Sequence, residues 1–229
     1  MKTGIYWQDP KYALKPGRDF IFDPSLVLYL PLHKLDGASF MSRDAYGHLC
    51  TVTGALWRPY GRYFDGSDDY ISVTSPWSPT ARFSFECWYQ PDTGYGNHTA
   101  AKLVQKGYHE LSISNTTGKV RFTVYNSTPT AYSALDDVAL TVGELYHLLG
   151  TYDPTDNKVR LYRDGALVKV GDTFTGDLPD CSSFPFSIGG VALSNRQAKG
   201  LIGEVRIYNR ALSPLEIQHN YLATKWRYQ

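Results

Sequence analysis

Residues 83–90 read Phe83-Ser84-Phe85-Glu86-Cys87-Trp88-Tyr89-Gln90, and their side chains alternate in character. The odd positions hold Phe, Phe, Cys and Tyr, whereas the even positions hold Ser, Glu, Trp and Gln. A side-chain period of two is what a β-strand with one buried face requires. We therefore expect a half-buried strand over these residues.

Strand signals of the same kind fill most of the chain. Alternation recurs at 119–125 and 158–163, and further strands are predicted at 26–32, 61–64, 70–73, 101–105, 109–114, 145–152, 166–170, 184–189 and 201–208. Asp164-Gly165 lies between two of them and indicates a tight hairpin, because a type I′ turn needs two residues at positive φ. The sequence therefore predicts an all-β chain.

One short helix is expected near the C-terminus, over residues 213–222. Ser213 suits the N-cap, Pro214 suits the first helical position, and Glu216 completes a capping box. We expect the helix to lie against the sheets with its apolar side, which is formed by Leu215, Ile217, Tyr221 and Leu222.

Length and composition exclude several classes of protein. A chain of 229 residues is within the range of a single all-β domain. Its net charge of +1 argues against a nucleic-acid partner, because such proteins carry a strong basic bias. Residues 1–10 lack an apolar segment, so we expect no signal peptide in this chain. The apolar run 26–32 is far shorter than the ~18 residues of a membrane span, so we expect no membrane insertion.

The three cysteines, Cys50, Cys87 and Cys181, show no CxxC spacing. An odd number leaves at least one thiol unpaired, and the spacing suits neither a disulfide framework nor a zinc site. We expect buried free thiols that pack as small apolar side chains.

Residues 1–24 differ from the rest and predict an irregular N-terminal arm ahead of a domain at 25–229. The arm shows little alternation and contains Tyr6, Trp7, Tyr12, Phe20 and Phe22. Because an exposed aromatic surface of this size marks an interaction site, we expect it to bind other structural proteins or further copies of this chain. The alternative is that the arm folds back and covers an edge of its own sheet.

Five segments in order carry a resemblance to a known family: 26–32, 63–71, 83–91, 145–165 and 200–213. The most distinctive are Phe64-Asp65-Gly66-Ser67-Asp68-Asp69-Tyr70 and Glu204-Val205-Arg206-Ile207-Tyr208-Asn209-Arg210-Ala211-Leu212-Ser213. The chain thus resembles the laminin-G-like, concanavalin A-like lectin/glucanase superfamily of the bacterial and viral type. The resemblance implies a jelly-roll sandwich of two antiparallel sheets with a concave side. It leaves function open, since this fold hosts lectins, glycosidases, adhesion modules and capsid parts.

Catalytic members of this superfamily carry a Glu-x-Asp-x-(x)-Glu strand, which this sequence lacks. Retaining glycosidases need two carboxyl groups about 5–5.5 Å apart. Each glutamate stands alone on its strand, loop or helix, although carboxylates from different strands remain able to meet: Glu86, Glu110, Glu144, Glu204 and Glu216. There is also no Gly-x-Ser-x-Gly, HExxH or phosphate-loop motif. We expect a protein that is not an enzyme.

Asp65, Asp68 and Asp69 form the densest group of carboxylates. Such residues either cap backbone N–H groups around a Gly turn or supply oxygen ligands to Ca²⁺. Related folds often hold Ca²⁺ with an acidic residue in the closing strand, where this chain has Gly203. We therefore favour turn capping and no cofactor, with a structural Ca²⁺ as the alternative.

Aromatic residues in loops suggest a ligand site. Tyr95, Asn97 and His98 fall in a predicted loop over 92–99, and Trp57, Tyr60 and Trp77 fall in other loops. Flat amphipathic rings are surfaces that sugars and proteins both use. These residues predict a sugar platform, and the alternative is that the rings pack at the rim of the core.

Two functions fit these observations. The first is a non-enzymatic structural or binding module on a virion, as a decoration or fibre component, or on an extracellular surface, with glycan binding as a further role. The second is a carbohydrate-binding, lectin-like module of a secreted or cell-surface system. The absence of a signal peptide and the aromatic arm favour the first, because virion proteins leave the cell by lysis.

Overall fold

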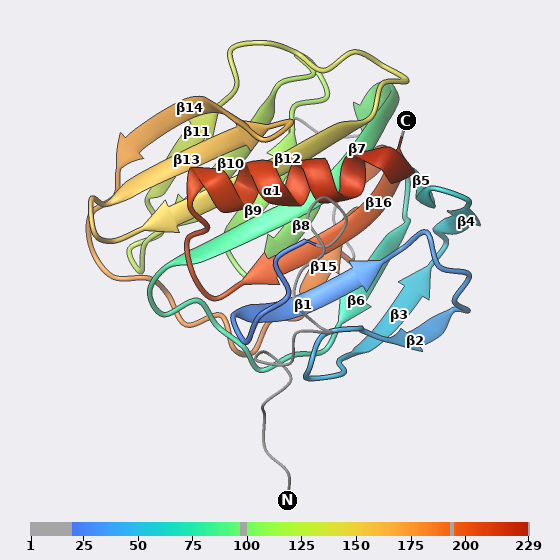
Figure 1. The fold of residues 1–229 in the computed structure, drawn as a ribbon, viewed down its shortest axis with the longest axis horizontal. Helices are drawn as coiled ribbons and strands as arrows, with labels where there is room; N and C mark the ends of the chain where they lie inside the picture. Colours follow the sequence, from blue (N-terminus) through green and yellow to red (C-terminus); the bar gives the residue numbers. More distant parts are fainter. Residues whose placement is uncertain (1–19, 97–99, 193–194, 229) are drawn as a thin grey trace, which may run out of the picture.

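The computed structural model describes residues 20–96, 100–192 and 195–228, which form a sandwich of two eight-stranded sheets (Figure 1). The first sheet has the spatial order β14 (Ala166–Thr173), β13 (Lys158–Arg163), β12 (Tyr146–Asp153), β7 (Phe83–Gly96), β16 (Ala198–Tyr208), β5 (Gly61–Asp65) and β4 (Leu56–Arg58), and β1 (Leu26–Pro31) also pairs with β16. The second sheet has the order β11 (Ala131–Leu135), β10 (Val120–Tyr125), β9 (His109–Ile113), β8 (Ala101–Lys106), β15 (Phe186–Ile188), β6 (Tyr70–Val73), β3 (Leu49–Thr53) and β2 (Ser39–Met41). The predicted all-β, concanavalin A-like sandwich of two antiparallel sheets is confirmed.

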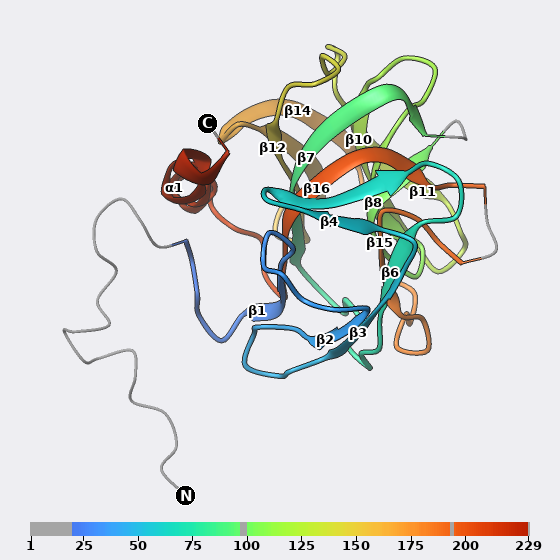
Figure 2. The ribbon, with the colours of Figure 1, turned by 90° about the vertical axis from the view of Figure 1, so that its right-hand side faces the viewer.

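The α-helix found among the described residues, α1 (Pro214–Thr224), lies across the outer face of the first sheet and continues into a short 3₁₀ turn at Lys225–Arg227. Figure 2 shows α1 on the side of this sheet that faces away from the second sheet. None of the helical segments in the described part of the chain has the length and apolar character needed to cross a membrane.

The alternation at residues 83–90 produces a strand that is buried on both faces. Phe83, Phe85 and Cys87 pack in the core between the sheets. The side chains of Glu86 and Trp88 point to the opposite face of the sheet, where α1 covers and buries them. The expectation of a half-buried strand is therefore wrong for β7, because the helix supplies a third layer over the polar face.

Local turn and cap chemistry follow the sequence closely. Asp164 and Gly165 adopt φ values of 53° and 79°, as a type I′ hairpin turn requires. The Ser213 side chain accepts a hydrogen bond from Glu216 N, and Ser213 N donates to the Glu216 carboxylate at 2.9 Å. The predicted capping box is confirmed.

The face that α1 turns toward the sheet agrees only in part with the predicted one: Ile217 is buried and Tyr221 stacks on Trp88, but the two leucines do not face the sheet. Its buried residues are Ile217, Asn220, Ala223 and Thr224, whereas Leu215 and Leu222 are exposed. The physical reason is that the sheet surface under α1 is polar: Asn220 donates to Glu86, and Thr224 accepts from the indole N–H of Trp88.

The predicted N-terminal arm falls largely outside the described residues, which begin at Phe20. Phe20 and Ile21 pack against an apolar cluster that includes Tyr208 and Ile217. Ile21 N donates to Asn220 Oδ1 at 2.7 Å, and the Tyr208 hydroxyl donates to Ile21 O at 2.8 Å. Residues 20–24 therefore fold back on the first sheet beside α1, covering part of its face rather than an edge.

Candidate functional site

The structure separates the four described members of the predicted ligand platform, which are Trp57, Tyr60, Trp77 and Tyr95. Tyr60, in the β4–β5 turn, is half exposed, and Trp77 stacks on Phe186 with ring centroids 5.6 Å apart. The Trp57 indole donates to His33 O at 3.1 Å. These side chains come from several positions around the sandwich.

Tyr95 lies in β7, which runs to Gly96, so the predicted loop over 92–99 begins later than expected. Its hydroxyl donates to Leu140 O at 2.9 Å, and its ring packs against the core. This is the rim-packing alternative. Asn97 and His98 lie outside the described residues.

Tyr60 belongs to a groove of about 420 Å³, here named the Tyr60 groove. Its floor is formed by three residues on adjacent strands of the first sheet. Leu201 on β16 pairs with Tyr63 on β5 and with Gln90 on β7. Arg58 and Tyr60 stand on one side, and Val142 stands on the other. The floor is thus part of the rigid sheet, and the β4–β5 turn and the 142–143 loop form the walls.

Polar groups in the Tyr60 groove are fixed by hydrogen bonds. The Tyr63 hydroxyl donates to Asp92 Oδ2 at 2.7 Å, and Thr93 N donates to Asp92 Oδ1 at 2.6 Å. The Gln90 amide nitrogen donates to Gly143 O at 2.5 Å. These bonds hold a carboxylate, an amide and a phenol in set positions around one exposed aromatic ring.

The bond between Tyr63 and Asp92 sets the charges of the groove. The Asp92 carboxylate accepts a hydrogen bond from the Tyr63 hydroxyl, and this contact raises the pKa of Tyr63 to about 12. The same bond, with that from Thr93, holds the pKa of Asp92 below its usual value. At neutral pH, Asp92 is therefore an ionised acceptor, and Tyr63 is a neutral donor committed to it.

Trp77 lines a separate pocket of about 230 Å³, which shares no lining residue with the Tyr60 groove. Its other aromatic walls are Tyr46 and His48, whose rings stack 5.8 Å apart, and Val27 also lines it. Tyr60 and Trp77 therefore line two distinct pockets, and neither Trp57 nor Tyr95 lines either of them.

The structure brings Asp65, Asp68 and Asp69 together at the turn between β5 and β6. Carboxylate oxygens of the three residues lie within 4.8 Å of one another. Asp69 Oδ2 accepts from Asp65 N at 2.9 Å, and Asp65 Oδ1 accepts from Ser67 N at 2.7 Å, so these side chains cap the turn. Burial and the charges of Asp65 and Asp68 raise the pKa of Asp69.

The oxygens of these three carboxylates are close enough together to share one Ca²⁺ ion. Ca²⁺ binds oxygen at about 2.3–2.6 Å, so oxygens less than about 5 Å apart can share one ion. Gly203, at which the family resemblance led us to expect an acidic residue, is remote from this corner. Asp65 pairs with Lys199 on β16, and a Cβ at Gly203 would lie 2.6 Å from the Tyr228 ring. The lack of a carboxylate at residue 203 therefore removes no ligand from the group formed by Asp65, Asp68 and Asp69.

Sequence reasoning missed a charged cluster that lies between the first sheet and α1, here named the buried cluster: Glu86, His147, Glu204, Arg206 and Asn220. The side chains of all five are buried. Arg206 bridges the two carboxylates, since it bonds both Glu86 and Glu204. His147 Nε2 lies 2.7 Å from Glu86 Oε1, and Asn220 Nδ2 donates to Glu86 Oε2 at 2.9 Å.

Glu86 is ionised in this interior. Burial alone would raise its pKa, but the charges of Arg206 and His147 and the hydrogen bonds from His147 and Asn220 outweigh burial and lower the pKa to about 2. Carboxylates from two strands do meet here, as the sequence left open. They do so around a guanidinium and under a helix, where a substrate has no access.

The other three glutamates also have hydrogen-bond or ion-pair partners. Glu110 pairs with Lys102 and with Arg121. The Tyr146 hydroxyl donates to Glu144 at 2.7 Å, and Glu216 caps α1. The only sequence signal for the buried cluster was a glutamate at an even position of an alternating strand.

Comparison with known proteins supports the architecture. Residues 65–218 match the sequence profile of the concanavalin A-like lectin/glucanases superfamily. The chain belongs to this superfamily. A comparison with curated proteins finds no match.

Solved structures share the fold at low sequence identity. One is the botulinum neurotoxin serotype D binding domain, with TM-score 0.67, 16% identity and coverage of 86% of this chain and 51% of that chain. Another is Trypanosoma rangeli sialidase in complex with the inhibitor DANA, with TM-score 0.66, 20% identity and coverage of 89% and 34%. The botulinum neurotoxin type G receptor binding domain has TM-score 0.66, 14% identity and coverage of 86% and 51%. This chain thus spans a third to a half of these longer proteins.

Proposed function

We propose that this chain is a non-catalytic binding module that recognises a glycan in the Tyr60 groove. The observation that carries the proposal is the exposed Tyr60 ring beside polar groups held on a rigid sheet. A sugar ring stacks on a flat aromatic surface, and its hydroxyls bond to fixed planar acceptors and donors. Asp92, Gln90 and Arg58 supply those groups.

Two observations support binding without catalysis. Among the described residues lining the Tyr60 groove, Asp92 is the only carboxylic acid, and glycoside hydrolysis by paired carboxyls needs two. The glutamates that do lie close together, Glu86 and Glu204, are buried and bonded to Arg206.

The structural neighbours also favour a binding role for this chain. Two of them are binding or receptor-binding domains of botulinum neurotoxins. The third is a sialidase held with an inhibitor. These ligands and receptors are those of the neighbouring proteins. For this chain, the neighbours support the proposal that the shared fold recognises a ligand.

We further propose that the module is displayed on a virion or an extracellular surface, where other structural proteins or copies of this chain bind residues 1–24. The aromatic content of that segment supports this, and so does Phe22, which is 42% exposed. For Asp65, Asp68 and Asp69 we favour capping of the β5–β6 turn without a cofactor, and a structural Ca²⁺ at these carboxylates is the alternative.

A glycan array tests the binding proposal. We expect a reproducible hit that Tyr60→Ala abolishes and that Tyr108→Ala preserves. Tyr108 is the matched control, because it is 45% exposed, against 50% for Tyr60, and lies outside the groove. A hit that survives Tyr60→Ala but is lost in Trp77→Ala would move the site to the other pocket, and the absence of any hit would overturn glycan recognition.

A further inference from the structure

The Tyr60 groove has a positive side and a negative side. Among the described residues that line it, the charged ones are Arg58 on β4 and Asp92 on β7. The spatial order of the strands is β7, β16, β5 and β4, so the backbones of these two residues lie about three strand spacings apart, roughly 14 Å. A ligand that spans the groove therefore meets a cation at one side and an anion at the other.

Arg58 projects from the same face of the sheet as the groove floor. Leu56 on β4 pairs with Tyr63 on β5, and paired residues of antiparallel strands project to one face. Side chains two residues apart on a strand also share a face, so Arg58 projects on the side of Leu56 and Tyr63. This direction agrees with the position of Arg58 in the wall of the groove.

The charge of Asp92 is already used within the protein, whereas that of Arg58 is not. Each oxygen of Asp92 accepts a hydrogen bond, one from Tyr63 and one from Thr93. Arg58 donates through Nη1 to Trp57 O at 3.3 Å and pairs with no described carboxylate. Eight of the eleven described arginines do pair with a carboxylate, so an unpaired guanidinium in a groove wall departs from the pattern of this chain.

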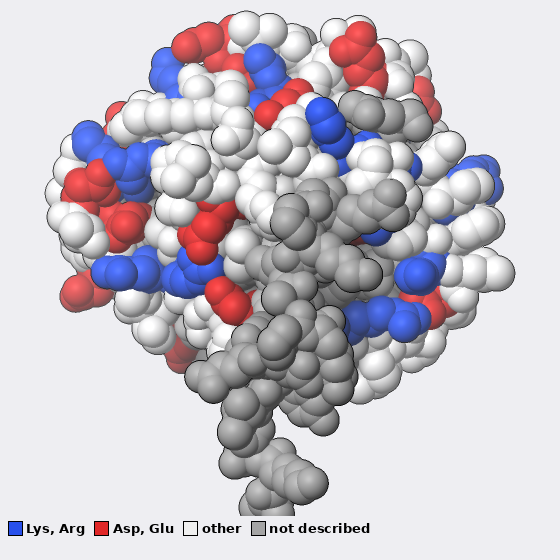
Figure 3. Space-filling model, in the orientation of Figure 1, with Lys and Arg blue, Asp and Glu red and all other residues white. Residues whose placement is uncertain are grey.

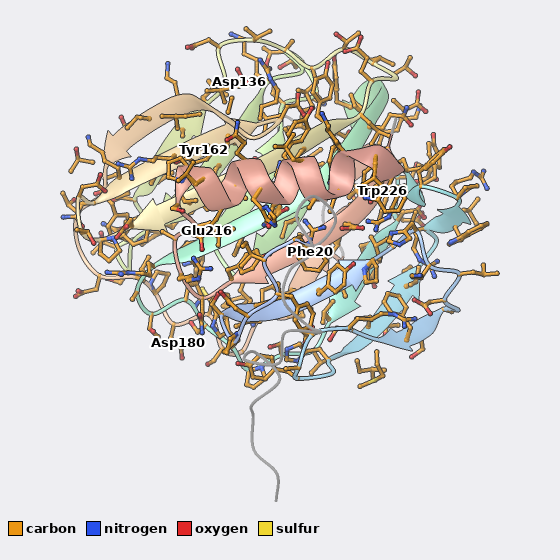
Figure 4. All side chains as sticks on the ribbon, viewed as in Figure 1. Phe20, Asp136, Tyr162, Asp180, Glu216 and Trp226 are labelled. Carbon is orange, nitrogen blue, oxygen red and sulfur yellow. The ribbon has the colours of Figure 1, made fainter. Side chains whose placement is uncertain are left out.

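The surroundings of Arg58 leave its charge available to a ligand. Figure 3 shows Lys and Arg side chains at the edge of the molecule where β4 and β5 lie. Figure 4 labels three acidic residues, Asp136, Asp180 and Glu216, and each of them lies away from that edge. Asp65 is at the opposite end of β5 from the turn that carries Arg58, and it caps the turn to β6.

We propose that the glycan bound in the Tyr60 groove carries a negative group, a carboxylate or a sulfate ester, which the Arg58 guanidinium binds. Arg58 and Tyr60 are two residues apart, at most about 7 Å along the chain, so one sugar residue can stack on the ring and reach the guanidinium. The planar fork of arginine donates two parallel hydrogen bonds to the oxygens of such a group. At the other side of the groove, Asp92 accepts bonds from uncharged hydroxyls of the ligand. This inference rests on the proposed glycan recognition and names the class of sugar.

Calorimetric titration of the full chain with matched sets of glycans tests the inference. Each set contains a neutral hexose glycan, its counterpart with a carboxylate at C6, and its counterpart with a sulfate ester at C6. We expect one acidic member to bind roughly tenfold more tightly than the neutral one, because hydrogen bonds to charged groups are the stronger ones. The preferred member identifies the negative group. The preference should shrink at about 1 M salt, where the Debye length is about 3 Å.

Variants of two exposed arginines assign the preference to its residue. Arg58→Gln should bring the affinities for the acidic and neutral members together. Arg82→Gln is the matched control, because Arg82 is also exposed but lies outside the groove, and it should keep the preference of the wild type. Thermal unfolding followed by circular dichroism checks that both variants are folded.

The possible failures separate this inference from the proposed function. Equal binding of acidic and neutral members, abolished by Tyr60→Ala, would overturn the inference and leave glycan recognition in the groove intact. A preference for acidic members that persists in Arg58→Gln would also overturn it, since the cation would then lie elsewhere. The absence of binding to every member of every set would overturn both.

Discussion

Replacing Glu86 by glutamine should cost this protein a large part of its stability. Glu86 is fully buried and joins three elements, since it bonds Arg206 on β16, His147 on β12 and Asn220 on α1. The amide of glutamine keeps the volume of the side chain but removes the charge that Arg206 needs. The buried cluster then holds a guanidinium with one carboxylate partner in place of two.

The size of the loss follows from two independent estimates. The pKa of Glu86 falls from 4.5 to about 2 in the folded state, which is worth about 3 kcal/mol of folding free energy at neutral pH. Removing one partner of a buried ion pair typically costs about 3–5 kcal/mol. For a chain of this size, a loss of about 3 kcal/mol lowers the melting temperature by roughly 6–12 °C.

The loss should depend on pH in a defined direction. Because the folded pKa of Glu86 lies below the unfolded value, its stabilisation is complete above about pH 5 and disappears as the pH falls toward 2. Urea unfolding of the wild type and Glu86→Gln, followed by circular dichroism, should therefore show curves that converge in acid. Glu144→Gln, at an exposed position, serves as the control. A loss below about 1 kcal/mol, or one that is the same at pH 3 and pH 7, would refute this reasoning.

Three further predictions follow from the same structure. EDTA should lower the melting temperature only slightly, because Asp65 and Asp69 already cap their turn without an ion; a large drop that disappears in Asp68→Ala would show that Ca²⁺ holds the corner. Incubation with β-glucans should release no reducing sugar, and release that is abolished by changing a single glutamate would contradict the binding role. Deleting residues 1–19 should leave the melting temperature unchanged, whereas deleting 1–24 should lower it, because Ile21 and Asp23 are bonded to Asn220 and Arg210; equal stability of the two truncations would count against the packing of residues 20–24.

Local chemistry made the fold predictable from the sequence. Side-chain alternation and apolar runs located most of the strands but missed β2, β3, β4 and β11, whereas Asp164-Gly165 located a hairpin and Ser213 with Glu216 located the start of α1. Each of these signals depends on residues close together in the chain, and the hairpin turn and the capping box were confirmed.

Contacts between distant residues were not predictable in the same way. Glu86 and Arg206 lie 120 residues apart and meet only because β7 pairs with β16 in one register. That pairing also explains why Leu215 and Leu222 point outward. The sheet under α1 offers a carboxylate and an indole N–H, so Asn220 and Thr224 must face it.

The candidate site was only partly predictable for a related reason. Tyr60 was identified as an exposed loop aromatic, but its polar neighbours Tyr63, Gln90 and Asp92 lie on or beside strands with no ligand motif. They converge because β5 and β7 flank β16. Trp77 and Tyr95 were grouped with Tyr60 by residue type, and the strand order separates them.

The most direct test of glycan recognition in the Tyr60 groove is an NMR titration of isotopically labelled protein with the strongest array ligand. We expect the shift changes to concentrate at Tyr60, Tyr63, Gln90 and Val142, the ligand to remain uncleaved, and Tyr60→Ala to weaken binding by at least about tenfold, which is about 1.4 kcal/mol. Shift changes centred on His48 and Trp77, or a ligand that is hydrolysed during the titration, would contradict the account.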